Sequence, residues 1–267
     1  MKAISLKYSL MILLAGTFSL SSCESSSDLS SGILARMVTS DNEGTTTINS
    51  DDLKSVTTGT DEITAEQIEW LKFMREEEKL AHDLYLALST DYTTPVFTNI
   101  ARAEQNHTSA VLTVLTAYGI EDPASSESGV FTNPDLQALY NTLLAQGKVT
   151  LIDALKVGAL VEETDILDVA DVYAGTPGDD LKTLAEALML GSRNHLRAFN
   201  RVLKANGIVY VPVALEQTDF DAIINSSWEK GTGLCMLTGK GTGGQYLCGT
   251  GTCINPGGRG FRGGRKS

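Results

Sequence analysis

Apolar residues recur at alternating intervals of three and four through most of residues 61–210. This spacing is typical of amphipathic helices that each bury one face. Start and stop signals divide the stretch into four long helices and one short helix. The long helices are expected at about 64–89, 94–119, 150–175 and 179–206, and the short helix at about 133–147.

Local signals mark the helix boundaries. A capping box, Thr64-x-x-Gln67, opens the first helix, because its two side chains can satisfy free backbone N–H groups of the first turn. Thr94-Pro95 opens the second helix, since proline is favoured at the first helical position. After the fourth helix, residues 208–211 form a strand-like apolar run that Pro212 breaks.

The lengths of the connections predict the topology. The first two long helices are joined by a few residues, as are the last two, so each pair should be antiparallel and adjacent. Residues 119–149 separate the second long helix from the third, and this segment is long enough to cross from one end of a bundle to the other. The pattern therefore predicts an all-α fold, a four-helix bundle with a long crossover and irregular tails.

Each predicted buried face is apolar except near its middle, where it carries carboxylates, histidines or both. These residues are Glu78 on the first helix, Glu104 and His107 on the second, Glu162 and Asp165 on the third, and His195 on the fourth. With turns near residues 92 and 179, the polar residues of each helix pair lie at the same height. An ionised carboxylate costs several kcal/mol to bury without a partner. A pair of divalent or trivalent metal ions would supply the compensating charge.

These features resemble a known family. The four helices, the long second connection and Glu-x-x-His at residues 104–107 resemble the ferritin-like di-metal carboxylate proteins, rubrerythrin among them. Three segments are more specific and resemble a bacterial ferritin-like family catalogued as a domain of unknown function. They are residues 75–81 (REEEKLA), 157–165 (VGALVEETD) and 191–199 (GSRNHLRAF). The resemblance covers about residues 61–210.

The resemblance implies ligand roles by position. Glu78 matches the ligand of the first helix, Glu104 the bridging carboxylate, His107 its terminal imidazole, Glu162 the ligand of the third helix, and His195 the imidazole of the fourth. The family pattern also has a second carboxylate one turn before the last histidine, where this chain has Gly191 and Ser192. This departure leaves room for one ion, or for two bound unequally, with Asp165 or Glu163 as a replacement ligand.

The resemblance implies iron as the cofactor, in one or two ions, with zinc and manganese as alternatives. Because a carboxylate-bridged iron pair reacts with O2 or peroxide, we expect an iron-dependent oxidase, peroxidase or ferroxidase. The alternative is a non-catalytic metal-binding protein that sequesters the ion or uses it to fix the bundle. The chain lacks a rubredoxin-like Cys-x-x-Cys pair, so electrons would come from a separate donor. A homodimer is a further expectation.

The first 22 residues have the pattern of a targeting segment, in which Lys2 and Lys7 precede an apolar stretch too short to span a membrane. Leu20-Ser21-Ser22-Cys23 resembles a bacterial lipobox, which implies lipidation of the Cys23 thiol and a membrane anchor. An ordinary secretory signal is the alternative. Both imply export, the lipoprotein to the periplasm or the cell surface. Residues 23–60 are polar and are expected to form a flexible tether.

Residues 211–267 are expected to form a Gly-rich, irregular tail. This tail contains Cys235, Cys248 and Cys253, and outside the cytoplasm one disulfide with one remaining thiol is expected. A metal site is the alternative, although the spacing of the cysteines does not match common zinc sites. The formal net charge of the whole chain is -12, which argues against nucleic acid as a partner.

Overall fold

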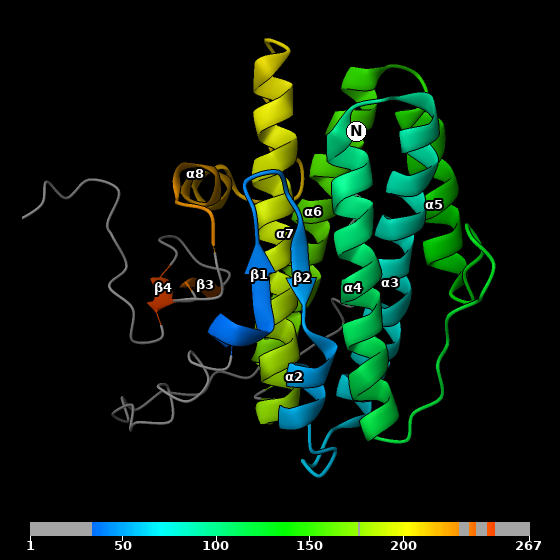
Figure 1. Cartoon of the computed structure of the whole chain (residues 1–267), viewed down its shortest axis with the longest axis vertical. Coiled ribbons are helices and arrows are strands. Elements are labelled where there is room, and N and C mark those ends of the chain that lie inside the picture. Colours follow the sequence, from blue (N-terminus) through cyan, green and yellow to red (C-terminus); the bar gives the residue numbers. More distant parts are fainter. Residues whose placement is uncertain (1–33, 176, 230–234, 239–244, 249–267) are drawn as a thin grey trace, which may run out of the picture.

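The computed structural model describes residues 34–175, 177–229, 235–238 and 245–248. In chain order, its elements are β1 (Val38–Ser40), β2 (Thr46–Ile48), α2 (Ser50–Val56), α3 (Ala65–Asp91), α4 (Pro95–Ala117), α5 (Pro134–Gly147), α6 (Leu151–Ala174), α7 (Asp179–Ala205), α8 (Gln217–Asn225), β3 (Cys235–Thr238) and β4 (Gln245–Cys248). The expected all-α bundle is confirmed, with α3, α4, α6 and α7 as its four long helices (Figure 1).

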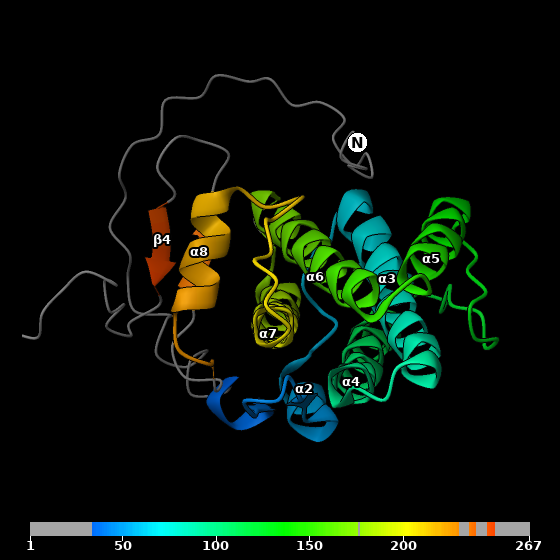
Figure 2. The same cartoon turned by 90° about the horizontal axis from the view of Figure 1, so that it is seen from above.

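The bundle is built from two helical hairpins. α3 packs along α4 and α6 along α7, while contacts of α4 with α7 and of α3 with α6 join the two hairpins. The connection between α4 and α6 carries the chain from one end of the bundle to the other, as expected from its length (Figure 1). Within it, α5 packs outside the bundle against α3 and α6 (Figure 2).

The helix boundaries follow the sequence signals closely. The capping box at Thr64 and Gln67 is present, and Pro95 is the first residue of α4. Gly119 and Gly207 lie just beyond the ends of α4 and α7 with φ of 64° and 75°. This left-handed conformation suits glycine, which has no Cβ to clash with the backbone.

The expectation of a flexible tether does not hold for residues 34–60. β1 and β2 pair in an antiparallel hairpin, with Val38 opposite Ile48, and β2 and α2 pack against α4. Most of the few large apolar side chains of this segment lie in the core: Leu34, Met37, Val38, Ile48 and Leu53 are each at most 2% exposed. The polar composition therefore hid the fact that the few apolar residues of this segment lie on one side, facing the core. Cys23 lies outside the described residues.

The segment after α7 also differs from expectation in part. Residues 208–211 form no strand; Tyr210 is buried, whereas Val209 and Val211 are 89% and 66% exposed. The expected irregular tail instead includes α8, which packs against α7 and buries Phe220 and Ile223. The body of the fold therefore extends past the predicted end of the bundle.

The cysteine-containing segment is described only in two short strands. β3 and β4 pair in an antiparallel ladder that places Cys235 opposite Cys248. A disulfide between them stays a prediction, and Cys253 lies outside the described residues. Within the part of the chain that the structure describes, no helix is both long and apolar enough to cross a membrane.

Candidate metal centre

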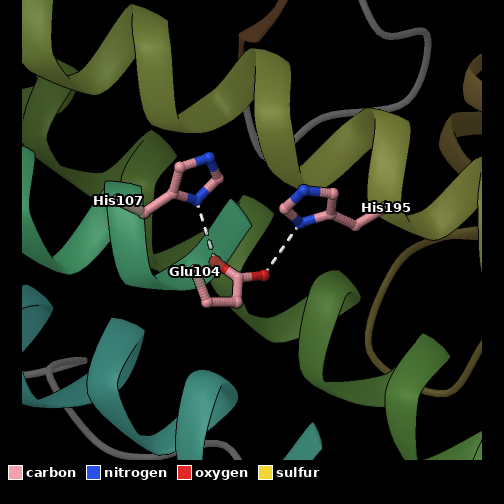
Figure 3. Close-up of side chains that lie close together, drawn as sticks. All are labelled: Glu104, His107 and His195. Carbon is pink, nitrogen blue, oxygen red and sulfur yellow. Dashed lines mark ion pairs between the residues drawn. The ribbon is translucent and has the colours of Figure 1, made fainter. Parts of the chain in front are cut away.

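Glu104 of α4 lies between two buried imidazoles. Its Oε2 is 2.9 Å from Nδ1 of His107, one turn further along α4, and its Oε1 is 2.8 Å from Nδ1 of His195 on α7. Figure 3 shows the two carboxylate oxygens directed at different rings. The rings are stacked, with centroids 5.1 Å apart. One carboxylate therefore links an imidazole of each helical hairpin.

Two further carboxylates extend this arrangement. Oε2 of Glu78 on α3 is 3.3 Å from Nδ1 of His107, and Oε2 of Glu162 on α6 is 3.3 Å from Nδ1 of His195. The centre thus has two halves, each with one imidazole, one carboxylate of its own and one oxygen of Glu104. Tyr85 donates a 2.6 Å hydrogen bond to Oε1 of Glu162, which fixes the orientation of that carboxylate.

The centre is closed to solvent, and many of its polar atoms lack a partner. Glu78, Glu104, His107, Glu162 and His195 are each at most 2% exposed. The buried atoms without an aligned hydrogen bond include both ring nitrogens of His107 and of His195, Oε1 of Glu78, Oε2 of Glu104 and Oδ1 of Asp165. Unpartnered buried polar atoms are costly, and metal coordination would satisfy oxygens and imidazole nitrogens together.

One group of these residues is compact enough to share a single ion. Glu104, His107 and His195 each offer an atom, and these atoms lie within 4.8 Å of one another. Mixed imidazole and carboxylate ligands suit iron, zinc and manganese. This buried group could therefore hold a metal ion, and its residues do not by themselves select which one.

The charges of the centre favour protons on the imidazoles when no metal is bound. Burial acts to raise the pKa of Glu104, but His195 and His107 hold it below its usual value. Burial acts to lower the pKa of His195, but Glu104 and Glu162 raise it to about 9. Against burial, Glu104 and Glu78 likewise raise the pKa of His107 well above its usual value. Burial raises the pKa of Glu78 to about 8. A metal ion would therefore have to displace protons.

Ser192, like Gly191, lies on α7 one turn before His195. It is buried, and its hydroxyl donates a hydrogen bond to Oδ2 of Asp165 on α6. The other oxygen of Asp165 has no hydrogen-bond partner. Burial, together with Glu78 and Glu162, raises the pKa of Asp165 well above its usual value. Asp165 thus reaches from α6 to this turn of α7.

Gly191, the other residue of this turn, makes room for His107. A Cβ on Gly191 would lie 2.2 Å from Cε1 and 2.5 Å from Nε2 of His107. These distances are far inside van der Waals contact, so α7 can pass the ring only because residue 191 has no side chain. A larger residue at position 191 would therefore displace the ring of His107.

Glu163 is not part of this group of residues, and its hydrogen-bond partners lie in the segment after α7. Its Oε1 accepts a 2.5 Å hydrogen bond from Tyr210, and its Oε2 accepts bonds from three successive backbone N–H groups, at Val213, Ala214 and Leu215. The residue is fully buried. Because its oxygens already have partners, Glu163 is a poor replacement ligand, and it fastens the segment after α7 to α6.

Replacing Tyr210 with phenylalanine is expected to lower the free energy of unfolding by about 1–3 kcal/mol, because a buried carboxylate loses its hydroxyl donor. Urea unfolding followed by circular dichroism measures the change. Tyr118→Phe is the matched control, since its hydroxyl bonds Asp180 at a partly buried position. A loss no larger than that of the control would contradict the role of Glu163 as a fastening point.

Sequence reasoning missed part of the acidic lining. Glu77, which was not among the predicted site residues, is 5% exposed, and its carboxyl shares a hydrogen bond with that of Asp168 on α6. The sequence did hold a signal for Asp168, the partner of Glu77. Glu162, Asp165 and Asp168 follow one another at intervals of three, which places successive acids near one another on a helix. His82 lies apart from the centre, with Nδ1 2.7 Å from the carbonyl oxygen of Ala101.

Comparisons with known proteins agree with the extent of the bundle. A family model described as "Uncharacterized protein domain (DUF2202)" matches residues 67–227. The chain is 45% identical over 170 residues to the uncharacterized protein MJ0754 of Methanocaldococcus jannaschii, which covers 63% of this chain and 92% of that protein. The crystal structure of hypothetical protein MJ0754 from Methanococcus jannaschii aligns with a TM-score of 0.63 and 43% identity. This alignment covers 64% of this chain and 98% of that chain.

Proposed function

The chain belongs to the DUF2202 family, and from its buried centre we propose that it is a ferritin-like metal-binding protein that holds iron for oxidative chemistry. The observation that carries the proposal is the position of Glu104, with one oxygen directed at each of two buried imidazoles. A carboxylate so placed can join two ions. Glu78 with His107, and Glu162 with His195, supply the remaining ligands of each half.

Bound iron would supply electrons to O2 or peroxide by passing from Fe(II) to Fe(III). The residues of this chain support that change in two ways. Four carboxylates, Glu78, Glu104, Glu162 and Asp165, provide negative charge that favours the ferric state. Tyr85 holds Glu162 in place through its hydroxyl, and the dry surroundings strengthen each of these charge interactions. The substrate is the iron itself, peroxide or an organic molecule.

A second candidate function is non-catalytic metal binding, for sequestration or to fix the bundle. One observation favours it: Ser192 and Gly191 stand where a second bridging carboxylate would lie, so the two halves are unequal. Zinc would satisfy the same ligands without reaction with O2, because it has no redox chemistry. Measurements of metal content and O2 reactivity separate the two functions.

The proposal includes a location outside the cytoplasm. What supports it is the sequence alone, namely the basic and apolar segment that precedes Leu20-Ser21-Ser22-Cys23. Lipidation of Cys23 would tie the metal-binding bundle to a membrane. The electron donor would then be a molecule of the same compartment.

Anaerobic loading with Fe(II), followed by analysis of metal content and exposure to O2, tests the proposed function. We expect about two irons per chain, as in di-iron bundles, and an absorption change on adding O2 or peroxide. Glu104→Gln should lose both ions, because it removes the charge of the carboxylate shared by the two halves and replaces one of its oxygens with an NH2 group. Glu186→Gln is the matched control, since it neutralises another buried acid of the bundle, on α7.

The outcomes separate the candidate functions. Iron that binds in the expected amount and does not react with O2 or peroxide would support the non-catalytic function. Wild-type protein that folds and takes up neither iron, zinc nor manganese would refute both. Equal iron content in Glu104→Gln and wild type would refute the proposed ligand set.

A further inference from the structure

A row of carboxylates runs along α6 from the centre to the surface. Glu162, Asp165, Asp168 and Asp171 follow one another at intervals of three. Each such step turns about 60° around the helix axis, so the row winds gradually from one face to the opposite one. Exposure follows this turn: Glu162 and Asp165 are buried, Asp168 is half-buried and Asp171 is exposed.

Glu77 of α3 joins the middle of this row. It is 5% exposed, and its carboxyl shares a hydrogen bond with that of Asp168. Outside this pair, neither Oε2 of Glu77 nor Oδ2 of Asp168 has a hydrogen-bond partner. Besides burial, the groups that act on Glu77 are carboxyls, those of Asp168, Asp165 and Glu78. A cluster of buried carboxyls without a cation is unfavourable. The oxygens of this pair therefore suit a positively charged ligand that takes the place of the shared proton.

Glu77 is also continuous with the metal centre. One narrow cavity, too small to admit a water molecule, is lined by five carboxylates and two apolar residues: Glu77, Glu78, Glu104, Glu162, Asp165, Ala81 and Val161. Glu77 therefore faces Asp168 of the outer row and shares a cavity with the proposed ligands. The indole N–H of Trp70 bonds the carbonyl oxygen of Asp168 at 2.9 Å, which ties α3 to α6 at this point.

Other sides of the bundle near the centre are covered. The β1–β2 hairpin lies over the groove between α4 and α7, where a Cβ on Gly44 would be 2.8 Å from Cβ of Ala198. On the outer side of α7, Arg193 and Arg197 pair with Glu229, which fastens the segment after α8 beside His195. The half of the α3–α6 interface next to α5 is covered by that helix.

We propose that Glu77 and Asp168 form a transit site through which divalent metal ions pass from the surface at Asp171 to the buried centre. This inference rests on the proposed function, because it needs a centre that binds metal. The paired oxygens of Glu77 and Asp168 hold the ion after it sheds part of its water. Asp165, which lines the same narrow cavity, then receives it with its unpartnered Oδ1, and the side chains of the lining must move apart to let the ion pass.

The rate of anaerobic metal uptake tests the transit site. Co(II), which reports its ligands by absorption, is mixed with the full metal-free chain, and its uptake is followed by stopped flow. Glu77→Gln and Asp168→Asn should each slow uptake by about 10-fold, the range by which acidic clefts accelerate cation arrival. The final Co(II) content and the dissociation constant should match wild type, because a transit site speeds entry and exit alike.

Two further variants serve as controls for the uptake experiment. Asp171→Asn changes only an exposed side chain, so it should fold normally and slow uptake by a smaller factor that disappears at high salt. Glu186→Gln is the control for loss of a buried acid, and should take up Co(II) at the wild-type rate. Circular dichroism of each variant, with thermal unfolding, shows that the bundle is intact.

Two results would overturn the transit site and leave the proposed function standing. In the first, Glu77→Gln and Asp168→Asn take up Co(II) as fast as wild type. In the second, they bind less Co(II) at equilibrium, which would make the two residues ligands of the centre. Wild-type protein that binds no metal would instead remove the proposed function itself, and with it the transit site.

Discussion

Alanine in place of Gly191 is expected to abolish metal binding in the half of the centre that contains His107. The added methyl group would lie 2.2 Å from Cε1 of His107, so the ring must leave its position beside Glu104 and Glu78. Loss of one ligand should weaken binding there by more than about 100-fold, the upper range for removal of an outer partner of a ligand. The helix itself should tolerate the change, because alanine is a better helix former than glycine.

Isothermal titration of the metal-free chain with Co(II) or Zn(II) measures this effect. His107→Ala should lose the same binding step as Gly191→Ala, and the double variant should bind no more weakly than His107→Ala alone. This non-additivity is the signature of a substitution that acts through the ring. Additive losses, or normal binding by Gly191→Ala, would show that His107 does not sit against α7 as described.

Metal affinity is expected to rise steeply with pH. In the metal-free protein Glu78 has a pKa of about 8 and His195 a pKa of about 9, while that of His107 is raised well above its usual value. All three carry protons at pH 6 to 7, and a metal ion must displace them. Release of two or more protons makes the overall association constant rise at least about 100-fold per pH unit in this range.

The stability of the metal-free protein is expected to depend on pH in the opposite direction, and to fall as pH rises. Glu78 has a folded pKa above its ordinary value of 4.5, and His195 one above 6.5. Such groups favour the folded state at low pH, and this contribution is lost as pH rises through about 8 and about 9. We therefore expect the midpoint of thermal unfolding of metal-free protein to fall from pH 6 to pH 9, and the gain on adding metal to grow. A pH-independent gain would contradict proton displacement.

The long helices and the polar middle of the bundle were readable from the sequence because both follow helical periodicity. Intervals of three and four place Glu104 and His107 on one face with Ile100 and Val111. The short turns set Glu78 level with Glu104 and His107, and His195 level with Glu162 and Asp165. These are local rules, and the structure brings the six predicted site residues together. Whether they bind metal stays a prediction.

The remaining features depend on contacts between distant segments, which periodicity does not encode. Residues 34–60 are polar in composition, and their few apolar residues become buried only by packing against α4 and α7. The hydrogen bond from Ser192 to Asp165 joins α7 to α6. The sequence did not predict this contact, and it left Asp165 and Glu163 as equal candidates for the replacement ligand. Glu77 is buried because Asp168 faces it from another helix.

The division of the bundle into two hairpins has a consequence for how the centre is assembled. Glu78, Glu104 and His107 belong to the α3–α4 hairpin, whereas Glu162 and His195 belong to the α6–α7 hairpin. Each hairpin can form from contacts between residues close in the chain, which is fast. The shared position of Glu104 exists only after the two hairpins dock. The metal would therefore bind late in folding, after the hairpins have docked. We expect it to slow the separation of the hairpins, and thus unfolding, with little effect on the rate of folding.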